Sequence, residues 1–89
     1  MNAILTVVGR DRVGIIAALC NKLSEYNVNV LDVSQTILQG IFTMTMLVDM
    51  SAADVDFACV QDELASLSQD LGVQITLQRE EVFKFMYRL

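Results

Sequence analysis

The chain has 89 residues, of which 54% are hydrophobic and 19% are charged, and its formal net charge is −5. This length and composition predict one soluble globular domain, because a disordered chain is less apolar and no apolar run reaches the roughly 18 residues of a membrane-spanning helix. The six Lys and Arg side chains are too few, on an acidic chain, to hold nucleic acid. The first residues lack the basic segment and cleavage site of a signal peptide, so we expect a cytoplasmic location.

Histidine is absent, and the two cysteines, Cys20 and Cys59, are far apart in the chain. Histidine is the commonest general base and metal ligand. Both cysteines lie in apolar periodic segments, which is typical of buried thiols that pack as small hydrophobic groups. We therefore expect no metal and no other cofactor, and any catalysis would depend on carboxylates, lysine or arginine.

The beginning of the chain predicts a strand followed by a helix. Residues 3–8 form a short apolar run that Gly9 ends, which is typical of a buried strand. From Val13 to Tyr26 the apolar residues recur at a spacing of three and four, which predicts a helix with one buried stripe. Asp11 is placed to cap the start of this helix, since its carboxylate can accept from amides that have no helical partner. Asn27 ends the helix.

The middle of the chain predicts a β-hairpin. Two β-type runs cover residues 28–50 and meet at Gln39-Gly40, where glycine supplies the positive φ angle that a tight turn requires. One face of the second run is strongly apolar and the other is mixed. The apolar face is expected to carry Phe42, Met44, Met46 and Val48, and the mixed face Thr43, Thr45 and Leu47.

The end of the chain predicts a helix, a strand and a helical tail. Ser51 and Asp54 resemble a capping box, and the apolar spacing after them predicts a helix that Gly72 closes. Residues 73–78 alternate as a strand, and residues 80–89 form a short amphipathic tail. The buried stripe expected for this second helix is Ala53, Phe57, Val60, Leu64, Leu67 and Leu71.

The order strand, helix, strand, strand, helix, strand contains two strand-helix-strand units. Right-handed crossovers place both helices on one side of a four-stranded antiparallel sheet, so the predicted fold is the α+β, ferredoxin-like βαββαβ sandwich with a short C-terminal helix. The far face of the sheet is left for solvent or for a partner. The side chains expected there are Ile4, Thr6, Val8, Thr43, Thr45, Gln74, Thr76 and Gln78.

The segment VVGRDRVGI joins the first strand to the first helix and holds a dense group of charges. The amides of Val13, Gly14 and Ile15 are expected at the helix N-terminus, where unpaired N–H groups and the helix dipole attract an anion. A small carboxylate fits better than a nucleotide, because the segment has no Walker pattern and no full GxGxxG. Arg10 and Arg12 can add charge-assisted contacts to that carboxylate. The alternative is an ordinary solvated loop, since such turns are commonly rich in Gly, Asp and Arg.

The motifs and their order resemble those of the ACT domain, a small-molecule regulatory module found on amino-acid biosynthetic enzymes and in glycine-cleavage regulators. The resemblance rests on the stretches GRDRVGIIAAL and SEYNVNVLDVSQT and extends through the last strand. In detail the chain is similar to the stand-alone single ACT-domain proteins of bacteria and archaea, including its tail, EEVFKFMYRL. Residues 1–79 would then be the ACT domain and residues 80–89 a helical tail of the same domain.

The resemblance implies a non-catalytic regulatory domain that pairs as a homodimer and binds an amino acid at the interface. The residues that match the family's pocket are Asp11, Arg12, Val13, Gly14 and Ile15. Many ACT domains have proline at the position of Val13, where proline only presets a helical φ angle. The resemblance therefore implies that residues 11–15 form a ligand-binding loop in this chain.

The resemblance also implies that the second strand, at the sheet edge, meets its twin and brings Asn29, Leu31, Asp32 and Val33 near the partner's loop. Asn29 and Asp32 would accept from the ligand's ammonium or hydroxyl. Asn29 is equally consistent with a turn residue, and Asp32 with an edge charge that discourages promiscuous pairing.

Two other functions match parts of the sequence. A protein–protein interaction module without a ligand would assemble through sheet edges and the far face. Its apolar tail, with Phe83, Phe85, Met86 and Tyr87, would pack on its own sheet or on a second copy. An acylphosphatase-like hydrolase is suggested by the string V-x-G-R-x-x-x-G-I, but the arginine that such enzymes need past the loop is replaced by Ile15, Ile16 and Ala17.

Overall fold

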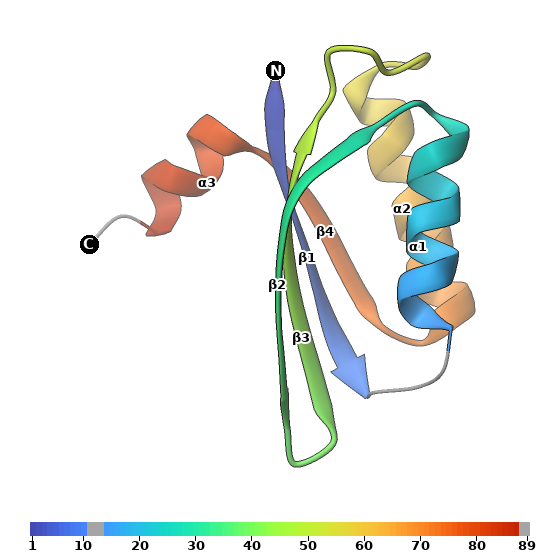
Figure 1. Cartoon of the computed structure of the whole chain (residues 1–89), viewed down its shortest axis with the longest axis vertical. Helices are drawn as coiled ribbons and strands as arrows, with labels where there is room; N and C mark the ends of the chain where they lie inside the picture. Colours follow the sequence, from blue (N-terminus) through green and yellow to red (C-terminus); the bar gives the residue numbers. More distant parts are fainter. Residues whose placement is uncertain (11–13, 88–89) are drawn as a thin grey trace.

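The fold is a four-stranded antiparallel sheet with two helices on one face and a third on the other (Figure 1). The computed structural model describes residues 1–10 and 14–87, with side chains as far as Lys84. The elements are β1 (Asn2–Arg10), α1 (Ile15–Glu25), β2 (Asn29–Leu38), β3 (Ile41–Asp49), α2 (Phe57–Leu71), β4 (Gln74–Arg79) and α3 (Glu80–Tyr87). The strands lie in the order β2-β3-β1-β4, which confirms the predicted ferredoxin-like arrangement with the second strand at the edge.

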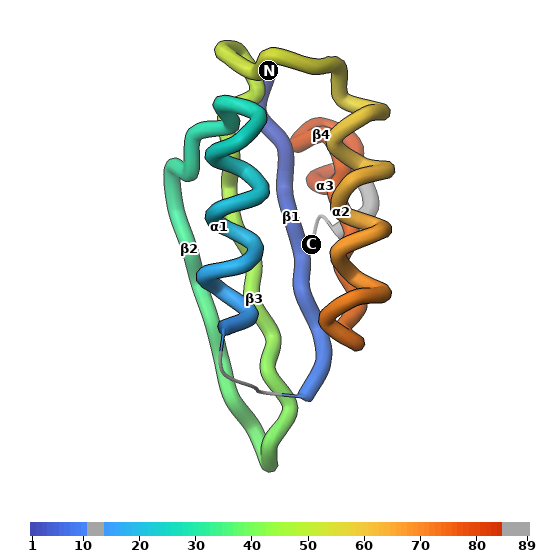
Figure 2. The backbone as a smooth tube through the Cα atoms, turned by 90° about the vertical axis from the view of Figure 1, so that its right-hand side faces the viewer, coloured from blue at the N-terminus to red at the C-terminus, as the bar shows by residue number. Residues whose placement is uncertain are grey.

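The core lies between the sheet and the two helices α1 and α2, which run side by side across one sheet face (Figure 2). The predicted alternation in the third strand is confirmed, because all four residues of its apolar face are buried. The six residues of the stripe predicted for the second helix all lie in or against the core, although Ala53 precedes the helix. Val60 and Leu64 are 1% exposed, whereas Phe57, Leu67 and Leu71 are partly buried at the rim of the core. Among the described helices, none is long and apolar enough to span a membrane.

Three turns have the backbone that the sequence predicts. Asn27 ends α1 with φ of 61°, and Gly72 caps α2 with φ of 69°. In the β2–β3 hairpin, Gln39 and Gly40 both have positive φ, at 51° and 80°. Such a pair is the turn that matches the twist of two antiparallel strands. The hairpin therefore forms where the sequence places it.

Gly9 does not end the first strand, as the sequence suggested, but lies inside it. β1 continues to Arg10, which pairs with Ile41 of β3. A Cβ atom added to Gly9 would lie 2.6 Å from Cγ1 of Val73 and 3.1 Å from its Cα. The glycine is needed because the chain entering β4 passes directly against it.

The predicted capping box at the start of the second helix is wrong. The α2 helix begins at Phe57, and its N-cap is Asp56, whose Oδ1 accepts from the amide of Cys59 at 2.9 Å. Ser51 is engaged elsewhere, since its amide and its hydroxyl both donate to Oδ1 of Asp49, at 2.9 and 2.7 Å. These bonds close a turn directly after β3, so the helix starts later.

Replacing Asp56 with alanine is expected to lower the free energy of unfolding by about 1 kcal/mol, because the substitution removes the side-chain acceptor for an orphan helix amide. Urea denaturation followed by circular dichroism measures the loss. Asp54→Ala is the matched control, because Asp54 is exposed and lies before the helix. Equal losses in both variants would contradict the assignment of Asp56 as the cap.

The expectation that both cysteines are buried is also wrong. Cys20 is exposed and Cys59 is half-buried. The buried face of α1 is made by Ile15, Leu19 and Leu23, and Cys20 lies one position beyond this stripe.

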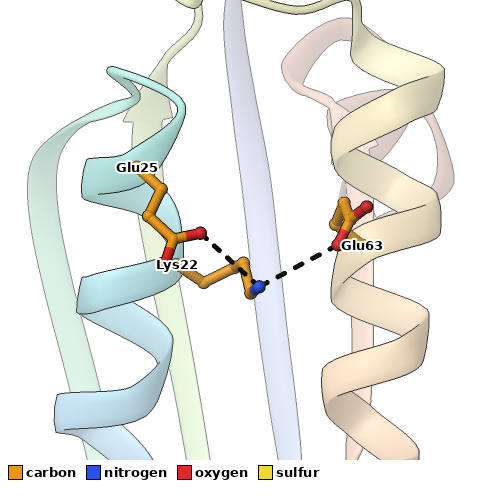
Figure 3. A network of polar contacts seen from close by, with 3 residues as sticks. All are labelled: Lys22, Glu25 and Glu63. Atoms are coloured by element: carbon orange, nitrogen blue, oxygen red, sulfur yellow. Dashed lines mark ion pairs between the residues drawn. The ribbon is translucent and has the colours of Figure 1, made fainter.

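A small polar cluster joins α1 to α2 on their outer surface (Figure 3). The Lys22 ammonium lies 3.5 Å from a carboxylate oxygen of Glu25 and 3.9 Å from one of Glu63. Partial burial and the neighbouring Glu63 carboxylate raise the pKa of Tyr26. Because these side chains are partly exposed, such ion pairs contribute at most about 1 kcal/mol each. The helices are therefore held together mainly by the apolar core.

Candidate functional site

The first helix begins at Ile15, two positions after Val13, where the sequence indicated its start. Gly14 is the N-cap, with φ of 93°, and its carbonyl accepts from the amide of Ala18 at 2.9 Å. Among the residues that the structure describes, no atom lies within 4 Å of a Cβ added at Gly14. The predicted N-cap at Asp11 is therefore wrong, because Gly14 has that position. Asp11, Arg12 and Val13 lie outside the described residues, so their predicted ligand-binding roles stay predictions.

The start of α1 presents backbone and no side-chain cap of its own, because its N-cap residue is glycine. Ile15 is 2% exposed and lies in the core, so it anchors the helix start and offers a ligand only its amide. The first-turn amides, together with the helix dipole, form an environment that favours a carboxylate. The glycine also has a second role that the sequence did not show, since its positive φ is strained for other residues.

Asn29 lies at the opposite end of α1 from Gly14. β2 runs back along the helix (Figure 2), so its first residue lies near the helix C-terminus. At 1.5 Å per residue, the 11 residues of α1 span about 16 Å. Within one chain, therefore, the structure does not bring Asn29 and Gly14 together.

A hollow of about 660 Å³ surrounds Asn29 beside the C-terminal end of α1. It is also lined by Ser24, Asn27 and Asp49, and Asn29 is opposite Asp49 in the β2–β3 register. Hydrogen bonds from the Ser51 hydroxyl and amide lower the pKa of the Asp49 carboxyl and hold it ionised. The sequence reasoning missed Asp49, although a serine two residues after an aspartate is a usual sign of a carboxylate fixed by a turn.

Asp32 lies on the sheet face away from α1. The β2–β3 register shifts between Val30 and Asp32, so Leu31 is an extra, bulged residue. After the bulge, Asp32 lies opposite Leu47 and lines a second hollow, of about 300 Å³, on the face away from α1. The structure therefore places Asp32 on the sheet face away from α1, the face that the register also gives to Asn29 and Asp49.

The edge strand β2 is uncovered along most of its length. Every residue from 31 to 38 is exposed, and within the described part of the chain β2 pairs only with β3. Four of these residues are apolar: Leu31 is 48% exposed, Val33 44%, Ile37 56% and Leu38 70%. An apolar edge with unpaired backbone groups is a template for another strand.

The tail forms α3 on the sheet face that α1 and α2 leave free, where it packs against β1 and β4 of its own chain (Figure 1). The sequence left open whether the tail packs on its own sheet or on a second copy. In the structure it packs on its own sheet. The described side chains include no cluster of three or more His, Cys, Asp or Glu residues that could hold a metal ion.

Comparison with known proteins gives consistent matches along the chain. The family model described as "ACT domain" matches residues 2–78. A UPF0237 protein of Bifidobacterium longum is 55% identical over 87 residues, which are 98% of this chain and 97% of the relative. The solved structure of an ACT domain protein from Streptococcus pneumoniae is 40% identical, has a TM-score of 0.81 and is matched over 98% of both chains. A putative glycine cleavage system transcriptional repressor, 22% identical over 86% of this chain and 44% of its own with a TM-score of 0.74, shares the fold.

Proposed function

Because the chain belongs to the ACT domain family, we propose that it is a non-catalytic regulatory domain that binds an amino acid at the interface of a homodimer. The observation that carries this proposal is the start of α1. Its cap is a glycine with open space around it, directly after the loop that matches the family's ligand-binding motif. The ligand carboxylate would accept from the first-turn amides of α1, beside Asp11, Arg12 and Val13.

The ligand ammonium needs acceptors, and in this proposal a second copy of the chain supplies them. If β2 pairs antiparallel with β2 of a second copy, the two strands run in opposite directions. The first residue of the partner's β2 then lies toward the end of the sheet where α1 begins. Asn29 and its register partner Asp49 would come from that second copy. An ionised carboxylate and an amide oxygen together suit an ammonium group.

Asp32 is left out of this proposed site, because it lines the second hollow, whereas Asp49 lines the hollow around Asn29. Asp49 replaces it as the acidic group. The proposed site therefore still contains one carboxylate, as the family resemblance implied, but Asp49 supplies it instead of Asp32.

Binding across two subunits would couple the ligand to assembly. A micromolar to millimolar site corresponds to about −8 to −4 kcal/mol. Because the ligand would contact both chains, it would favour the dimer, or one subunit angle, by its differential affinity for the two states. A protein partner could then respond to that change.

A thermal-shift screen against the amino acids and related metabolites tests the proposal. At least one compound is expected to raise the melting temperature, and Gly14→Asn is expected to weaken that compound's binding about tenfold by filling the open space. The matched control is Gly40→Asn, since Gly40 also has positive φ, at 80°, and open space around it. Asparagine is the residue that best tolerates this backbone region. Equal loss in both variants, or no hit in the screen, would contradict the amino acid site.

A homodimeric interaction module without a ligand is the second candidate. The exposed apolar residues of β2 favour it, because they support assembly whether or not a ligand binds. A screen without hits, together with an intact dimer, would support this function.

A further inference from the structure

The hollow around Asp32 has a floor built from three strands. Ile4 of β1 is opposite Leu47 of β3, and Leu47 is opposite Asp32 of β2. These three side chains therefore form one row across the far face, two apolar groups followed by a carboxylate. Thr45 and Ser34 form the adjacent row and supply hydroxyl groups.

The first turns of α3 form the wall of the same hollow. Glu80 and Lys84 both line it and pair with each other at 3.2 Å. The Glu80 side chain is 29% exposed, whereas that of Lys84 is 72% exposed and reaches toward solvent. The described lining of the hollow thus contains two carboxylates and one ammonium, which is already paired.

Asp32 has acceptor capacity left for a ligand. Its Oδ1 accepts from the amide of Val33 at 2.9 Å, which fixes the orientation of the carboxyl group. Since a carboxylate offers about four lone-pair sites on its two oxygens, Oδ2 stays available for a further donor. A donor with positive charge is favoured, because the remaining charge of the hollow is negative.

We propose that this hollow between α3 and the far sheet face binds a small primary amine with an apolar body and no carboxylate. The ammonium would donate to Asp32 and to the nearby hydroxyl groups, and the apolar chain would lie on Ile4 and Leu47. A ligand carboxylate would meet Asp32 and Glu80, so amino acids are disfavoured here. The volume of about 300 Å³ is at the small end for ligand pockets, which limits the ligand to a short chain. This site is independent of the one proposed at Gly14.

Titration of the ¹⁵N-labelled full chain with n-pentylamine, sodium pentanoate and 1-pentanol, at pH 7, tests the proposal. The three probes share one apolar chain and differ in charge. Pentylamine is expected to shift the amide resonances of Ile4, Thr45 and Leu47, and pentanoate is expected to leave them in place. Pentanol is expected to bind at least about threefold more weakly than the amine, because it lacks the charge-assisted hydrogen bond.

Asp32→Asn is the decisive variant, since it keeps the shape of the side chain and removes its charge. It is expected to weaken pentylamine binding about tenfold. Asp62→Asn, an exposed residue of α2 on the other side of the sheet, is the control and is expected to change nothing. Equal binding of amine and carboxylate, an unchanged affinity in Asp32→Asn, or shifts confined to other parts of the chain would each overturn the proposal. None of these outcomes bears on the amino acid screen, whose probes and variants are different.

Discussion

Gly9→Ala is expected to lower the free energy of unfolding by about 1–3 kcal/mol, although it adds only one methyl group. The new Cβ would lie 2.6 Å from Cγ1 and 2.9 Å from Cβ of Val73. Atoms that belong to a side chain can turn away, but the Cα of Val73, at 3.1 Å, can move only with the backbone. Overpacking that displaces backbone in this way costs energy of that order.

A double-mutant cycle with Val73→Ala checks the cause of the loss. Removal of the two γ-methyl groups eliminates the closest contact, so Gly9→Ala should cost less in the Val73→Ala background than alone. Chemical denaturation of the four proteins measures the coupling. Additive losses would show that the glycine is needed for another reason.

The combined substitution of Val33 and Ile37 with lysine is expected to raise the dissociation constant of the proposed homodimer at least about a hundredfold, or about 2.7 kcal/mol. Val33 and Ile37 are 44% and 56% exposed on the edge strand. The substitutions remove apolar surface from the proposed interface and bring four ammonium groups together in the dimer. Lysine on an edge strand is also a natural means of preventing strand pairing. Sedimentation velocity across a range of protein concentrations measures the change.

Val8→Lys is the control for the edge-strand variant. Val8 is also apolar and 38% exposed, but lies on the far face of β1. It is expected to leave the dimer intact and to change the free energy of unfolding by no more than about 0.5 kcal/mol. Dissociation by Val8→Lys and not by the edge variant would mean that the copies pack face to face.

Much of the fold follows from periodicity and turn chemistry. The alternation from Phe42 to Val48 and the glycine-containing turn at Gly40 identify β3 and its hairpin without knowledge of the rest of the chain. In contrast, the role of Gly9 depends on Val73, which is distant in sequence and close only after folding. Local pattern cannot show such an approach.

The bulge in β2 places Asp32 on the sheet face away from the helices. A regular strand that buries Val30 would also turn Asp32 inward, onto the face that packs against the helices. A carboxylate has no partner there, so the extra residue Leu31 shifts the register and places Val33 opposite Met46 instead. In a regular strand Asp32 would point inward, and this unfavourable placement was the sign in the sequence that β2 contains a bulge. The start of α2 was misplaced for a similar reason, since Ser51 binds Asp49 and leaves capping to Asp56.

The most direct test of an amino acid site shared by two subunits is an NMR titration of the dimer with the compound that gives the largest thermal shift. The amide resonances of Gly14, Ile15 and Asn29 are predicted to move together with one dissociation constant, although about 16 Å of helix separates them within a chain. In the monomeric variant with Val33 and Ile37 replaced, the same concentrations are predicted to leave these resonances unchanged. Equal binding by the monomer, or movement of Gly14 without Asn29, would contradict a site built from two subunits.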